Sequence, residues 1–77
     1  MQETENGLIG RRVVSLKPDL DHDENDNERP IPIGSSGTIA RLNHVDSRGQ
    51  AHYDVSWDNA AWTVYSRSEI DGDLKLS

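Results

Sequence analysis

The residues best suited to chemistry form one acidic segment, residues 19–36, in which only Arg29 opposes the negative charges. Aspartates recur at every second position at its start, as in a calcium-binding loop, but Glu24 and Pro30 replace that loop's glycine and closing glutamate. We therefore expect a long, irregular, solvated loop that attracts basic partners. Weak calcium binding is the alternative that this spacing leaves open. The carboxylates of this acidic loop are Asp19, Asp21, Asp23, Glu24, Asp26 and Glu28.

The histidines and serines predict neither a metal site nor a catalytic centre. His22, His44 and His52 lack the short ligand spacing of a zinc site, and the chain has no cysteine. No serine lies in a Gly-x-Ser-x-Gly nucleophile elbow, and Ser35 and Ser36 lie in a turn without the lysine of a phosphate-binding loop. We therefore expect no catalytic residues, no metal and no cofactor.

The aromatic side chains allow two interpretations. The chain has two Trp, two Tyr and no Phe, so these rings could simply fill its core. Two of them flank one predicted turn and would meet as a cross-strand pair, which could instead form an exposed platform for a protein partner. On the second interpretation, the predicted partner-binding residues are Trp57, Asp58, Asn59, Trp62 and Tyr65.

The elements that would position these residues are three short β-type runs between residues 37 and 65, separated by turn residues. The middle run alternates strictly and places Val55 on one face together with two of the aromatic rings. In the first run, Ile39 and Leu42 are out of phase, which predicts a bulge that brings both to the core. The runs cover residues 38–42, 51–57 and 62–65, and the turn between the last two covers residues 58–61.

Further runs extend this meander on both sides. Residues 10–16 form a first predicted strand with Val14 and Leu16 on one face. Residues 66–70 predict a 3₁₀ turn that returns Ile70 to the core, and residues 74–76 a last strand or tail. We therefore expect an all-β chain of about five short antiparallel strands without a helix, closed into a small barrel. The residues expected to fill its middle are Val14, Ile39, Val55, Val64 and Ile70.

Size and charge bound the possible functions. The chain has 77 residues, a net charge of −6 and a sequence pI near 4.8, so it suits one small domain that avoids nucleic acid. We expect a flexible lead-in over residues 1–9 and a barrel over residues 10–77. No apolar run is long enough to span a membrane, and the acidic start lacks the features of a secretory signal, which predicts a cytoplasmic protein. A small core without disulfides leaves a homo-oligomer open.

Three segments carry a recognisable pattern: Gly10-Arg11-Arg12-Val13, Gly37-Thr38-Ile39 and Val55-Ser56-Trp57-Asp58-Asn59. They resemble the SH3-like β-barrel domains of small bacterial and phage proteins of uncharacterised function. The resemblance covers roughly residues 10–70 and implies the fold rather than an activity. Mind-bomb-type SH3-like modules are similar in the same segments. The family pattern prefers glycine where this chain has Ala60, which favours a longer turn over a tight Asn-Gly hairpin.

Residues 62–65 are also similar to the Val-Gln-Ile-Tyr strand of plasmid-encoded type II dihydrofolate reductase, an SH3-like barrel that is active as a tetramer. That resemblance implies folate and NADPH binding around a shared pore. Tyr65 matches, and Val64 is a conservative replacement. Thr63 stands where the family uses Gln, and its hydroxyl cannot present a paired amide donor and acceptor.

We therefore expect a non-enzymatic protein-binding or regulatory module whose partner has a basic surface. An acidic factor of a phage or mobile element is the second hypothesis. It would mimic nucleic acid and use residues 19–28 to compete for a basic groove. A reductase of the type II class is the third.

Overall fold

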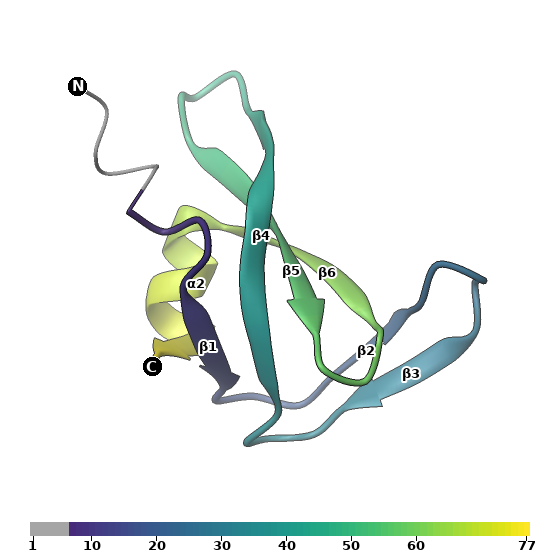
Figure 1. Cartoon of the computed structure of the whole chain (residues 1–77). Helices are drawn as coiled ribbons and strands as arrows, with labels where there is room; N and C mark the ends of the chain where they lie inside the picture. The colour runs from purple at the N-terminus through teal and green to yellow at the C-terminus, as the bar shows by residue number, and fades with distance from the viewer. Residues whose placement is uncertain (1–6) are drawn as a thin grey trace.

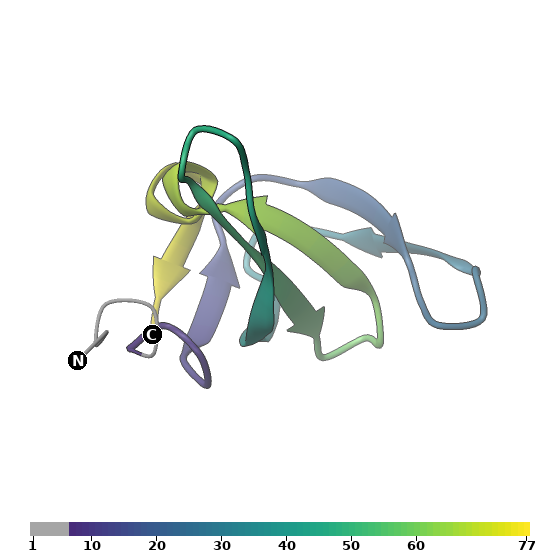
Figure 2. The same ribbon diagram turned by 90° about the horizontal axis from the view of Figure 1, so that it is seen from above.

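Seven short strands form one curled antiparallel sheet that closes part of the way into a barrel (Figure 1). The structure, a computed structural model, describes residues 7–77. Helix α2 lies at one end of the sheet, and the β2–β3 hairpin projects from the other (Figure 2). The elements are β1 Arg12–Ser15, β2 Asp19–His22, β3 Glu28–Ile31, β4 Ser36–Val45, β5 Ala51–Trp57, β6 Trp62–Ser66, α2 Arg67–Asp73 and β7 Leu74–Leu76.

The strand order is β3-β2-β6-β5-β4-β1-β7, with the predicted meander β4-β5-β6 at its centre. An all-β, barrel-like architecture is therefore confirmed. The expected number of about five strands is wrong because the acidic segment 19–36 is not an irregular loop. It contains the β2–β3 hairpin, and Ile31, which is only 1% exposed, anchors that hairpin in the core.

The core contains three of the five side chains expected there, namely Ile39, Val55 and Ile70. Val14 is only partly buried, and the fully buried residue of β1 is its neighbour Val13. The residue of β1 that faces the core is therefore one position earlier than expected. Its place is set by pairing on both sides, since Val13 pairs with Gly37 of β4 and with Leu76 of β7. These long-range pairings override the local pattern. Leu16, the other residue expected on the buried face of β1, is exposed.

Strand β6 also buries the opposite face from the one expected. Val64 is 48% exposed, whereas Thr63 and Tyr65 are buried. The cause is the length of the β5–β6 turn. Trp57 pairs with Ala61 through its backbone N–H, 2.9 Å from the Ala61 carbonyl, so three residues rather than four form the turn. A difference of one residue exchanges the two faces of the strand that follows.

Strand β4 contains the predicted bulge. Its register against β5 shifts between Ile39 and Arg41, and shifts again between Leu42 and His44. The first shift brings Leu42 opposite the buried Tyr53. Leu42 is still 37% exposed, so the expectation that the bulge would bury it is wrong.

Helix α2 was not expected, because seven residues are too few to show helical periodicity. A capping box starts it: the Ser66 hydroxyl accepts a hydrogen bond from the Glu69 backbone, and the Glu69 carboxylate accepts one from the Ser66 backbone. The Ser-x-x-Glu pattern at residues 66–69 is the sequence feature that could have predicted the start of this helix. Ile70 enters the core from this helix, and β7 follows as the predicted last strand.

The predicted lead-in lies partly outside the described residues, which begin at residue 7. Leu8, within that lead-in, is 5% exposed and belongs to the core. Over residues 7–77, no helix has the length and apolar character needed to cross a bilayer.

We predict that Gly37→Ala lowers the free energy of unfolding by about 1–3 kcal/mol, because an added methyl group overpacks the core. Its Cβ would lie 2.8 Å from Trp57 Cε3 and 2.9 Å from the Ser56 carbonyl oxygen. Chemical denaturation measures the effect. Gly72→Ala is the control: its Cβ meets nothing within 4 Å, so stability should stay unchanged or rise. Equal effects of the two substitutions would contradict the packing described for Gly37.

Candidate functional site

Two pockets lie where the β2–β3 hairpin meets the turn between β5 and β6. The apolar pocket has a volume of about 380 Å³ and the acidic pocket about 420 Å³. Neighbouring residues of one strand line different pockets: Trp57 faces the first, and Ser56 faces the second. The apolar pocket is lined by Pro30, Pro32, Ser35, Ser36, Trp57, Asp58 and Asn59. The acidic pocket is lined by Asp23, Glu24, Asn25, Arg29, Ser56, Ala60 and Trp62.

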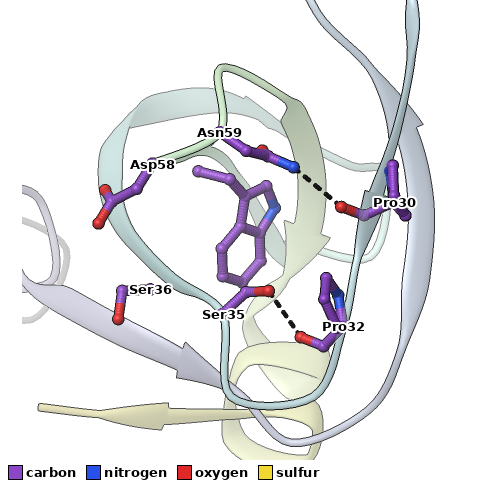
Figure 3. A pocket seen from close by; sticks show the side chains of 7 residues that line it. Pro30, Pro32, Ser35, Ser36, Asp58 and Asn59 are labelled. Atoms are coloured by element: carbon purple, nitrogen blue, oxygen red, sulfur yellow. Dashed lines mark hydrogen bonds between the residues drawn. The ribbon is translucent and has the colours of Figure 1, made fainter.

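Several polar side chains around the apolar pocket, those of Ser35, Asp58 and Asn59, are already hydrogen-bonded within the chain, two of them as Figure 3 shows. Asn59 Nδ2 donates to the Pro30 carbonyl at 2.8 Å, which joins the turn to the hairpin. The Asp58 carboxylate accepts two hydrogen bonds from the Arg12 guanidinium, at 2.7 and 3.0 Å. These bonds lower the pKa of Asp58. This pocket therefore offers mainly apolar surface to a ligand.

The turn between the pockets carries local backbone strain. Ala60 has φ +78°, in the left-handed region where glycine is favoured, and its N–H donates to the Trp57 carbonyl. Because the turn consists of Asp58, Asn59 and Ala60, the four-residue turn expected through Ala61 is one residue too long. Ala61 itself is fully buried.

The acidic pocket combines an aromatic wall with an available carboxylate. Trp62 is partly exposed, and the Arg41 guanidinium carbon lies 5.0 Å from the centroid of its ring, in a cation–π contact. Glu24 is exposed and has no hydrogen bond or ion pair with the rest of residues 7–77. A cationic side chain entering this pocket could therefore contact both the ring and a carboxylate.

Asp23 has a structural role in this pocket. Its Oδ1 accepts the backbone N–H groups of Asn25 and Asn27, both at 2.9 Å, and its Oδ2 accepts from Arg29 Nε at 3.0 Å. The hydrogen bond from Asn27, followed by those from Arg29 and Asn25, lowers the pKa of Asp23. The side chain is 6% exposed, so its carboxylate closes the hairpin and leaves Glu24 as the one facing solvent.

The predicted partner-binding residues separate into core and surface. Trp57 and Tyr65 are 2% and 5% exposed and pack edge to face, so they belong to the core. Asp58 and Asn59 are exposed, and Trp62 is partly exposed. The expected pairing of the two tryptophans is wrong because Trp62 lies opposite Ser56, on the other face of the sheet from Trp57.

The acidic residues also divide by environment. Asp23 and Glu24 line the acidic pocket, while Asp26 and Glu28 are exposed nearby on the hairpin. Asp21 is partly buried, and Asp19 Oδ2 lies 3.4 Å from the Tyr65 hydroxyl. Burial, together with this carboxylate, raises the pKa of Tyr65.

Sequence reasoning missed the polar contacts on the outer face of β4 and β5. Asp54 accepts from Arg41 Nε at 2.6 Å and from Asn43 Nδ2 at 2.8 Å, and its side chain is only 10% exposed. Because the β4 bulge sets which residue faces Asp54, strand alternation alone could not identify its partners. Through Arg41, this carboxylate fixes the cation that covers Trp62.

The histidines form no metal centre within the described part of the chain. The rings of His44 and His52 stack with centroids 4.4 Å apart, and His52 Nε2 lies 2.9 Å from Asp46 Oδ2. No group of three or more potential ligands lies together among residues 7–77.

Comparisons with protein-family models, with curated proteins and with solved structures found no match.

We predict that Ala60→Gly raises the free energy of unfolding by up to about 1 kcal/mol, because glycine adopts the left-handed conformation without strain. Chemical denaturation checks this. Ala61→Gly is the control and should be destabilising, because it removes a buried methyl group next to the same turn. A loss of stability in Ala60→Gly would show that Ala60 is unstrained.

We also predict that acid opens the hairpin tip through Asp23. The native pKa of this carboxyl lies below its ordinary value of 3.8, so its stabilising contribution is present above that value. The contribution is lost as the pH falls through the native pKa. Amide exchange at Asn25 and Asn27 should therefore be faster in Asp23→Asn than in the parent protein at neutral pH, and the difference should shrink in acid.

Asp26→Asn is the matched control for this experiment. It changes an exposed carboxylate at the same tip, at a position with φ +64° that Asn tolerates. Equal protection in the two variants at neutral pH would contradict the role given to Asp23.

Proposed function

We propose that this chain is a non-enzymatic protein-binding module with an SH3-like barrel fold, and that its acidic pocket binds a basic segment of a partner protein. The observation that carries the proposal is the meeting of Trp62 with the β2–β3 hairpin tip, where Glu24 is available. An aromatic face beside a free carboxylate suits an ammonium or guanidinium group.

The strand order supports the SH3-like barrel. The meander β4-β5-β6 lies between β1 and β7 on one side and the hairpin that follows β1 on the other. The chain returns through one short helix to pair its last strand with its first. These features agree with a small barrel that has a long excursion after its first strand.

The contact between Arg41 and Trp62 supports the choice of a cationic ligand. The ring already holds one guanidinium from its own chain, at 5.0 Å from its centroid. Attraction between this ring and a cation is therefore favourable in this environment. A partner's cation would approach from the pocket side, toward Glu24.

The distribution of charge supports a basic partner as well. Five basic side chains form ion pairs with aspartates of the same chain. The acidic residues at the hairpin tip include Glu24, Asp26 and Glu28, all exposed. Their field would speed the approach of a basic segment and would repel acidic ones.

The other two hypotheses have less support. A mimic of nucleic acid needs a row of free charges, whereas Asp23 is held by hydrogen bonds and Asp19 lies against Tyr65. For the reductase, Thr63 and Tyr65 would have to face ligands. Both are buried in this chain, and the Thr63 hydroxyl accepts a hydrogen bond from Trp57 Nε1 at 3.1 Å.

We predict that Glu24→Gln and Trp62→Ala each weaken binding of Lys- and Arg-containing peptides by about threefold or more, because each removes one contact with the cation. An array of short basic peptides, with acidic peptides of equal length beside them, identifies a ligand. Fluorescence anisotropy then measures its affinity. The buried Trp57 remains in both variants, so its fluorescence reports whether the fold is intact.

Glu28→Gln is the matched control, since it removes the same charge from the same hairpin but lies outside the pocket. It should weaken binding less than Glu24→Gln. Equal effects of the two changes, or equal binding of basic and acidic peptides by the parent protein, would refute the pocket as the binding site.

A further inference from the structure

Next to the acidic pocket, the sheet exposes two aliphatic side chains that the pocket itself does not use. Leu20 of β2 is 54% exposed and Val64 of β6 is 48% exposed. His22 and Trp62 pair directly across these two strands. Leu20 and Val64 each lie two residues from that pair, so they share its face of the sheet. Further along the same two strands, the Tyr65 hydroxyl lies 3.4 Å from Asp19 Oδ2, a contact between side chains.

From this arrangement we infer that the site recognises an amphipathic partner segment, with a cationic residue in the acidic pocket and an apolar residue on Leu20 and Val64. The inference rests on the proposed function and specifies its ligand. Trp62 and Val64 are two residues apart on one strand, which corresponds to about 7 Å. The same distance separates side chains i and i+2 of an extended segment, so the favoured sequence is Lys or Arg, any residue, then an apolar residue.

Charge complementarity decides between this occupant and others. The aliphatic pair adjoins a hairpin tip whose carboxylates include Glu24, Asp26 and Glu28. A second copy of the chain would bring its own net charge of −6 to the same place. An anionic membrane or a nucleic acid would be repelled for the same reason. A segment that carries its apolar residue next to a cation gains from both parts of the surface.

The test compares two fluorescent peptides of equal charge, one containing Arg-Ser-Leu and the other Arg-Ser-Ser in the same position. The parent protein should bind the leucine peptide about fivefold more tightly, because a partly exposed aliphatic contact becomes buried. Val64→Thr, which keeps the β-branched shape, should remove this preference. Backbone amide shifts at Leu20 and Val64 should appear only with the leucine peptide.

Val45→Thr is the matched control. Val45 is a 50% exposed strand valine outside this surface, at the far end of β4. It should keep the full preference for leucine. An equal loss in Val45→Thr and Val64→Thr would overturn the inference.

The outcomes separate this inference from the proposed function. If both peptides bind equally and Glu24→Gln weakens both, the acidic pocket binds cations and the amphipathic preference is refuted. If neither peptide binds, both proposals fail. If sedimentation shows a dimer that Val64→Thr dissociates, a second copy covers this face and the inference is overturned.

Discussion

The packing of Trp57 against Gly37 is the contact on which the rest of the sheet depends. The indole lies so close to Gly37 that a β-carbon there would be 2.8 Å from Trp57 Cε3, and the indole Nε1 donates to the Thr63 hydroxyl of the next strand. The edge-to-face contact with Tyr65 fills the space beyond. One side chain thereby joins β4, β5 and β6, which the small aliphatic residues of this chain could not do alone. Because the indole of Trp57 belongs to the core, Trp62 on the opposite face is the tryptophan that stays partly exposed.

Much of the central meander follows from local pattern. Strict alternation in residues 51–57 identified β5 and its buried face, and the phase conflict between Ile39 and Leu42 identified the bulge in β4. The local pattern could not predict which residues of a strand face the core where pairing with distant strands or the length of a turn decides this. Val13 faces the core because β1 pairs with β4 and β7. Trp62 faces outward because its turn is one residue shorter than its composition suggested.

The β2–β3 hairpin shows why the acidic composition of residues 19–36 led to the wrong prediction of an irregular loop. A dense series of carboxylates suggests mutual repulsion and an extended loop. Here Asp23 uses both oxygens to bind the backbone of its own turn and Arg29, so one of these charges helps to form the structure. The sequence identified Trp62 and the acidic segment separately as candidates for binding. Their meeting in one pocket depends on the pairing of His22 with Trp62, which lies 40 positions further along the chain, and no local pattern reports it.

The sheet remains open, with β3 and β7 as its outer strands. On β3, Pro30 has no N–H, and its carbonyl is taken by Asn59 rather than by β2. In an extended strand the N and C=O of one residue point to the same side, so the missing donor faces the free edge. A foreign strand meets neither a donor nor a free acceptor there. The free edge of β3 is thus interrupted at Pro30, which shortens the ladder that an added strand could form along it.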